Sequence, residues 1–143
     1  GKFVNKIQRS GKRTIAERIM YDSLEYIKKK IPDKDPVEIL MTAIENVKPQ
    51  LETKSRRVGG ATYQVPVPVG PKRQLSLAVK WIITSARSKR KRGKEPKPGR
   101  KPMYVNLAEE ILSAYKGEGG AIKKRDEVHR TAEGNRAFAH LAF

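Results

Sequence analysis

The apolar residues of this chain change their spacing once, and that change limits the folds it can adopt. On both sides of residues 52–69 they recur every three to five positions, which is typical of amphipathic helices. From Tyr63 to Val69 they alternate with Gln or Pro, after a Gly59-Gly60 pair that predicts a hairpin turn. The chain is therefore predicted to be mainly α-helical, with one protruding two-stranded β-hairpin arm over about 52–69.

Several helices are expected around this arm. The clearest start is the run from Asp35 to Glu38, which has Asp at the N-cap, Pro at the first position and Glu at the third. Pro49 is expected to end that helix. The remaining segments with helical periodicity are 14–30, about 75–87, 107–115 and 121 to about 142, with Phe3, Val4 and Ile7 as the tail of a further helix.

The chain also carries a large positive charge. Its 143 residues include 32 Lys and Arg against 15 Asp and Glu, a formal net charge of +17. Self-repulsion of this size is costly in a free monomer, so we expect a polyanionic partner, either nucleic acid or an anionic membrane surface. The longest apolar runs are shorter than a membrane span, and no secretory leader opens the sequence. The length fits a single domain over 1–143.

Candidates for catalysis or metal binding are few. His129 and His140 are the only histidines, and they stand eleven positions apart, whereas two imidazoles that hold zinc on a helix are spaced i, i+4. The adjacent carboxylates at 109–110 and 126–127 point about 100° apart on a helix, so they do not converge on one atom. The sequence has no cysteine. We therefore predict no catalytic residue, no metal site and no cofactor.

Separate clusters of basic residues are the candidates for phosphate contact. Each Lys or Arg that meets a nucleic-acid backbone releases a counterion and adds affinity. Residues 87–101 hold nine basic residues in fifteen positions, which predicts a mobile basic loop over about 88–101. A solvated helix face is the alternative for any one cluster. The candidates are Arg9, Lys12, Arg13, Lys54, Arg56, Arg57, Lys72, Arg73, Arg87, Lys123, Lys124, Arg125 and Arg136.

Two aromatic residues bear on the same question. Tyr63, on a ribbon with basic flanks, suits stacking against an unpaired RNA base, and packing within the ribbon is the alternative. Trp81 falls on the apolar face of its helix and is predicted to lie in the core.

Four segments make the sequence resemble the bacterial-type small-subunit ribosomal protein seven family. They are Glu45 to Pro49, SRRVGGATYQVPVPV from Ser55, the helix around Lys80-Trp81-Ile82, and AIKKRDEVHRTAEGNRAFAH from Ala121. The resemblance implies about six helices with a β-hairpin arm, and no enzymatic activity. It implies a primary rRNA-binding protein that binds the 3′ major domain of 16S-type rRNA and nucleates assembly of the subunit head, near the decoding region.

The resemblance also implies partners and further site residues. The arm, with Gly59, Gly60, Tyr63 and Gln64, would lie near the exit-site tRNA, and Asn135 joins Arg136 as a candidate for rRNA contact. Small-subunit proteins nine and eleven would be neighbours, with mRNA nearby and no membrane partner. The expected location is the cytoplasmic ribosome, with an organellar ribosome as the alternative.

Two other classes of function stay open from the sequence alone. An RNA-modifying or RNA-processing enzyme would turn over RNA and would need a pocket with perturbed titratable groups. A DNA-compacting basic protein would bind duplex DNA about as well as structured RNA. The resemblance also leaves the basic loop at 88–101 without a partner, because that loop is longer than the family pattern predicts.

Overall fold

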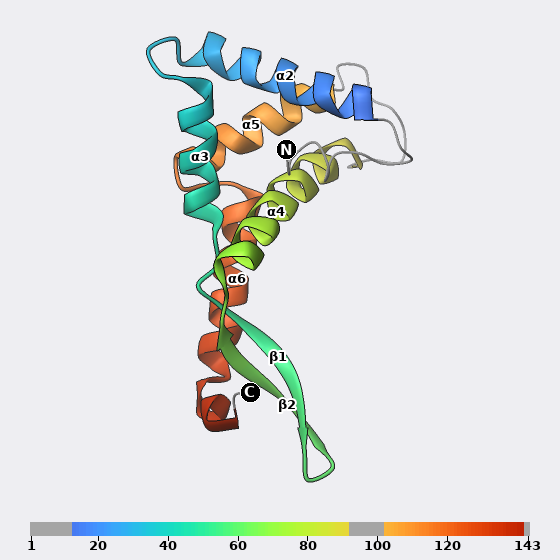
Figure 1. Cartoon of the computed structure of the whole chain (residues 1–143), viewed down its shortest axis with the longest axis vertical. Helices are drawn as coiled ribbons and strands as arrows, with labels where there is room; N and C mark the ends of the chain where they lie inside the picture. Colours follow the sequence, from blue (N-terminus) through green and yellow to red (C-terminus); the bar gives the residue numbers. More distant parts are fainter. Residues whose placement is uncertain (1–12, 92–101, 142–143) are drawn as a thin grey trace.

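The computed structural model describes residues 13–91 and 102–141, and in them the predicted combination of helices and one hairpin is confirmed (Figure 1). In the sequence, helices α2 and α3 precede the hairpin, and helices α4, α5 and α6 follow it. A short 3₁₀ helix, η1, closes the described chain. The elements are α2 (Arg13–Lys30), α3 (Pro36–Val47), β1 (Leu51–Val58), β2 (Ala61–Pro68), α4 (Pro71–Lys91), α5 (Met103–Tyr115), α6 (Gly120–Gly134) and η1 (Arg136–Leu141).

Helix α5 is the centre of the helical body. It contacts α2, α3, α4 and α6, and its residues Leu107 and Ile111 are fully buried. Ile82 of α4 is equally buried, and the neighbouring Trp81 belongs to the same core, as the sequence predicts. Removal of this apolar surface from water is the main favourable contribution to folding in a chain without disulfides.

Helix α3 begins as its sequence predicts. The Asp35 side chain accepts a hydrogen bond of 3.0 Å from the backbone N–H of Val37, and Pro36 is the first helical residue. This cap satisfies one of the N–H groups that the first turn leaves without an intrahelical partner. The helix ends at Val47, two residues before Pro49.

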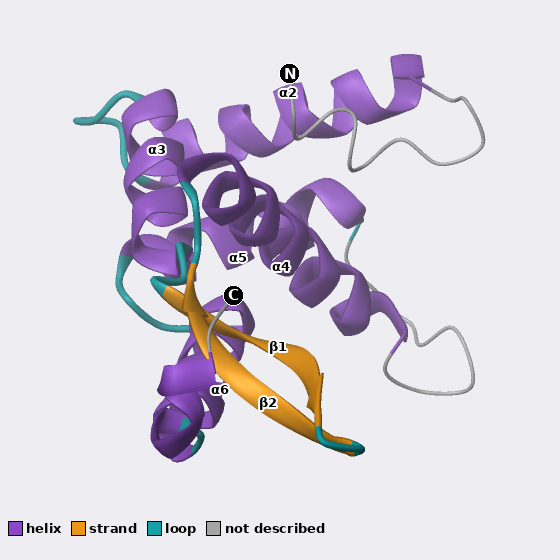
Figure 2. Cartoon of the chain, turned by 60° about the horizontal axis from the view of Figure 1, so that its bottom comes forward, coloured by secondary structure: helices purple, strands orange, loops and turns teal. Residues whose placement is uncertain are grey.

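The hairpin turns at Gly59 and Gly60, which have φ values of 58° and 84°. Positive φ at both central residues is what a type I′ turn requires, and glycine adopts it without a steric penalty. The hairpin extends away from the helical body, and α6 runs beside it (Figures 1 and 2). Helix α6 and η1 contact the strands, and Val65 and Val67 are buried. The arm therefore protrudes, but its inner face is covered.

The predicted ends of two helices are wrong, and α5 begins at Met103, four residues before the predicted 107. Helix α4 continues to Lys91, so the first four residues of the segment predicted as a loop over 88–101 are helical. Lys and Arg are good helix formers, and no Gly or Pro interrupts the sequence there. At the other end, the helix predicted over 121–142 stops at Gly134, and η1 follows as a 3₁₀ helix. Glycine is a poor helix former, and the Asn135 side chain donates to the Thr131 carbonyl oxygen there (2.8 Å). The predicted tail at Phe3 to Ile7 and residues 92–101 lie outside the described residues.

Candidate nucleic-acid interface

The excess positive charge of the described residues lies on one part of the molecule. Residues 51–91, which form the hairpin and α4, contain ten Lys and Arg and a single acidic residue, Glu52. Residues 13–50 contain seven basic and seven acidic residues, and residues 102–141 contain six of each. The hairpin and α4 are therefore the part of the described chain where a polyanion is attracted most strongly.

A stripe of basic residues runs along one face of α4. Arg73, Lys80 and Arg87 are spaced by seven residues, which places them on one face of a helix over about 21 Å. Arg73 and Lys80 are exposed, and Arg87 is half-buried. Sequence reasoning chose Arg73 and Arg87 but missed Lys80, although the seven-residue spacing is a signal that could have found it.

The strand register separates the residues of the arm into two faces. Arg57 and Gln64 lie on the outer face, where both are exposed, and the Gln64 amide donates a 2.8 Å hydrogen bond to Ser55 across the strands. Arg56 pairs with Tyr63 on the inner face, where both are half-buried. The ring of Tyr63 lies 5.1 Å from that of Phe138 in η1. The structure therefore favours the packing interpretation of Tyr63.

Arg73 also has a partner within the chain. Its Nε lies 2.7 and 3.0 Å from the two carboxylate oxygens of Glu52, and this hydrogen bond raises the pKa of Arg73, with the negative charge of Glu52 as the second cause. The Glu52 side chain is only 11% exposed, whereas the Arg73 side chain is 57% exposed. The ion pair joins the base of β1 to the first turn of α4. Part of the charge of Arg73 is therefore neutralised within the chain itself.

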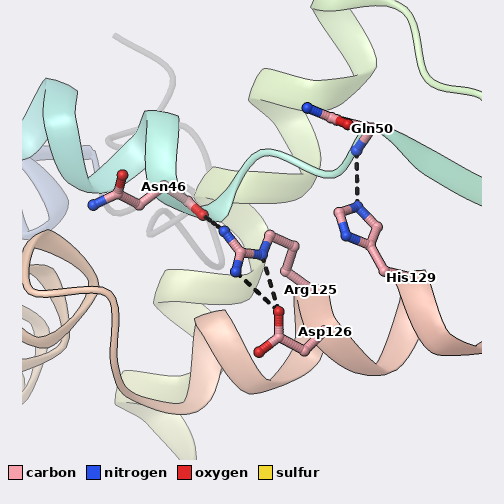
Figure 3. A network of polar contacts seen from close by, with 5 residues as sticks. All are labelled: Asn46, Gln50, Arg125, Asp126 and His129. Carbon is pink, nitrogen blue, oxygen red and sulfur yellow. Dashed lines mark hydrogen bonds and ion pairs between the residues drawn. The ribbon is translucent and has the colours of Figure 1, made fainter.

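Helix α6 holds both ends of residues 46–50, which lead from the last turn of α3 to β1 and are called the linker here (Figure 3). Arg125 donates to the backbone carbonyl of Asn46 and, at 2.9 and 3.2 Å, to the carboxylate of Asp126. One helical turn later, His129 Nε2 accepts a 2.9 Å hydrogen bond from the backbone N–H of Gln50. Because Arg125 and His129 are spaced i, i+4, one face of α6 sets the direction in which the hairpin leaves the body.

The same linker has further partners. Gln74 of α4 donates to the carbonyl oxygen of Pro49 (3.0 Å), and the Asn46 side chain donates to the carbonyl oxygens of Ala114 and Tyr115 at the end of α5 (3.0 and 3.2 Å). Three helices thus hold the base of the arm through hydrogen bonds between residues distant in the sequence. Sequence reasoning treated His129 as an ordinary histidine and Arg125 as a candidate for RNA contact, so it missed this network.

Replacing Arg125 by Gln is expected to lower the free energy of unfolding by about 1.5–3 kcal/mol, because a half-buried charged donor to Asn46 is lost. The control is Lys124→Gln. Lys124 is exposed, and its Nζ lies 3.9 Å from Glu127 Oε1. Such surface ion pairs contribute about 0–1 kcal/mol to the free energy of unfolding. Urea unfolding followed by circular dichroism measures both. Equal stability of the two variants would show that Arg125 does not hold the linker.

The remaining predicted residues are placed as follows. Arg13 is the first residue of α2, and Arg9 and Lys12 lie outside the described residues. Arg136 is exposed, and its Nη1 lies 4.0 Å from Glu133 Oε2. Asn135 is half-buried at the C-terminal end of α6. The exposed ones are Lys54, Gly59 and Gly60 on the hairpin, Lys72 on α4, and Lys123 and Lys124 on α6.

Residues 13–91 and 102–141 contain neither a metal-binding cluster nor a helix that could span a membrane. Within these ranges, His, Asp and Glu side chains do not gather in threes as a metal ion would need. The described helices are also too short or too polar to cross a membrane.

The chain is similar to known proteins over almost its whole length. A family model described as "Ribosomal protein S7p/S5e" matches residues 1–136. Proteins named "Small ribosomal subunit protein uS7" from Variovorax paradoxus (strain S110) and Verminephrobacter eiseniae (strain EF01-2) are 55% and 56% identical over 142 residues, which is 99% of this chain and 85% of each relative. The protein of that name from Pseudothermotoga lettingae is 54% identical over 140 residues, 98% of this chain and 84% of its own.

Proposed function

The chain belongs to the ribosomal protein S7p/S5e family, and on this premise we propose that it is a non-enzymatic constituent of the small ribosomal subunit which binds rRNA through its hairpin and α4. The observation that carries the proposal is the segregation of charge. Of the described residues, those of the hairpin and α4 hold ten basic side chains against one acid, while the flanking segments are neutral. An rRNA backbone would supply the missing negative charge.

The proposed partner within the subunit is the 3′ major domain of 16S-type rRNA, where the protein would act as a primary binder that nucleates assembly of the head. Exposed cations would position it by contacts with phosphates, and the irregular shape of a folded RNA would supply selectivity. The arm sequence from Ser55 to Val69 supports this assignment, because it is one of the four segments that carry the resemblance to the family. The protein would act in the ribosome, and no membrane partner is proposed.

The arm is proposed to reach towards the exit-site tRNA, near mRNA and small-subunit protein eleven, with protein nine as a further neighbour. Its outer face supports this role. Arg57 and Gln64 are exposed there, close to the turn at Gly59 and Gly60, while the inner face is covered by α6 and η1. The outer face and the tip are therefore the parts of the arm most open to a further partner, and the exposed Lys54 and half-buried Arg56 can add to that surface.

Competition binding tests the proposal against the two other classes of function. A labelled transcript of the 3′ major domain is bound to the protein and challenged with unlabelled transcript or with random duplex DNA. We expect the transcript to compete at least tenfold better than the duplex. Equal competition would indicate a DNA-compacting protein, and cleavage or modification of the transcript on prolonged incubation would indicate an enzyme.

Replacing Arg56 and Arg57 together by Ala is expected to weaken binding of the transcript by about 1–3 kcal/mol, because charge-assisted contacts with phosphates are lost. Helix content should stay unchanged, since both residues lie on β1. The control is Arg18→Ala, which removes an exposed arginine from α2, in the electrically neutral part of the chain. Filter binding measures the affinities. An unchanged affinity of the double variant would exclude this end of the hairpin as a contact surface.

A further inference from the structure

A hollow of about 280 Å³ lies between α4 and α6. Each helix lines it with four residues at positions i, i+3, i+4 and i+7, so one stripe of each helix faces the other. The lining residues are Trp81, Thr84, Ser85 and Ser88 of α4, and Gly120, Lys123, Lys124 and Glu127 of α6.

The approach of the two helices depends on Gly120. A Cβ at this position would lie 2.6 Å from Ser85 Oγ, which is closer than real Cβ contacts, and 3.1 Å from Ser85 Cβ, which is tighter than most of them. A residue with a side chain at position 120 would therefore require the Ser85 side chain or the two helices to move. The shape of the hollow is thus set by close packing of two helices that belong to the core.

The lining combines an apolar floor with a cationic rim. Trp81 is 8% exposed, so the indole is part of the core and presents only a small surface to the hollow. Lys123 and Lys124 are exposed, and Lys124 Nζ lies 3.9 Å from Glu127, so the rim keeps a net positive charge. Thr84 and Ser85 add hydroxyl groups that can donate or accept hydrogen bonds, and the Ser88 hydroxyl, which donates to the Ser85 carbonyl oxygen (2.9 Å), can still accept one.

We infer that this hollow holds one nucleobase splayed out of the rRNA, with the adjoining phosphate at Lys123 and Lys124. The inference rests on the proposed rRNA binding and adds a site to it. A base needs an apolar surface for its face and polar groups for its edge, and its phosphate needs a cation; the hollow offers all three. At about 280 Å³ the hollow lies just below the roughly 300–1,000 Å³ of small-molecule sites, so it can hold at most a single base.

Trp81 is the only tryptophan of the chain, so tryptophan emission comes from a residue that lines this hollow. The full chain is titrated with the 3′ major domain transcript at fixed protein concentration. We expect the emission of Trp81 to fall in parallel with binding measured independently on filters. This measurement uses the wild-type protein, so it remains valid even if a variant fails to fold.

The variant Thr84→Phe tests the site by filling it. Thr84 is exposed on α4, and Phe has nearly the same helix propensity, so the helix should be retained. The matched control is Thr42→Phe, the same change at an exposed position of α3, in the electrically neutral part of the chain. Because a stacked base is worth about 1–3 kcal/mol, we expect Thr84→Phe to bind the transcript about 5- to 150-fold more weakly, and Thr42→Phe to bind like the wild type.

The outcomes separate this inference from the proposed function. Loss of affinity in Thr84→Phe alone, together with a fall of Trp81 emission in the wild type, supports a base in the hollow. If the wild type binds the transcript but its Trp81 emission stays constant and Thr84→Phe binds equally well, the inference is overturned and rRNA binding stands. If the wild type does not bind the transcript, both are overturned.

Discussion

Raising the monovalent salt concentration from 50 to 200 mM is expected to weaken binding to the rRNA transcript by about four orders of magnitude. The hairpin and α4 carry ten basic residues, and together with Lys123 and Lys124 they can meet about eight phosphates. Release of the counterions from eight phosphates predicts a slope of roughly −6 to −7 for log affinity against log salt. Filter binding at four or five salt concentrations measures that slope.

The control for this experiment is the double variant Arg56→Ala/Arg57→Ala. Removing up to two phosphate contacts should make the slope less steep by about 1 to 2, because each contact contributes somewhat less than one. A slope near zero for the wild type would contradict electrostatic binding and with it the proposed interface. An unchanged slope in the double variant would place the contacts elsewhere on the chain.

Replacing Ile111 by Ala is expected to lower the free energy of unfolding by about 2–5 kcal/mol. Ile111 is fully buried in α5, the helix that contacts α2, α3, α4 and α6, so the cavity left behind would be lined by several elements that cannot all move inward. Native domains of this kind are stable by only about 5–15 kcal/mol, so the loss is a large fraction of the total. Thermal or urea unfolding followed by circular dichroism measures it.

The matched control is Ile15→Ala. Ile15 is 53% exposed on α2, and Ala is the better helix former, so its replacement should change the stability by less than about 0.5 kcal/mol. If Ile111→Ala were as stable as the control, α5 would not be the centre of the core. The same two variants should leave the affinity for RNA unchanged under conditions where both are folded, because neither side chain lies on the hairpin or α4.

Local signals in the sequence predicted much of the fold. The start of α3 follows from Asp35 and Pro36, and the hairpin turn follows from two adjacent glycines, because caps and turns are decided within a few residues. The helix ends that were wrong, at Lys91 and Gly134, lie where local signals were present but were given too little weight. Lys and Arg favour the continuation of α4, and Gly134 favours the end of α6.

The candidate interface was predicted less completely. Sequence reasoning identified the basic residues by type, yet it could not separate Lys124, which is exposed, from Arg125, which is bound to a carbonyl 79 residues away in the sequence. Arg73 and Lys72 differ in the same way, because only Arg73 meets the buried Glu52. The partner of each arginine is brought near only by the folded chain.

The sequence by itself determined the kinds of element, the position of the hairpin turn and the concentration of positive charge in residues 51–91, because these depend on neighbours along the chain. The tertiary structure decided which cations face outward and in which direction the arm leaves the body. Both depend on contacts between α6 and the linker after α3, exemplified by Arg125 with Asn46 and His129 with Gln50. Such contacts form only when distant segments pack together, so no periodicity or local motif encodes them.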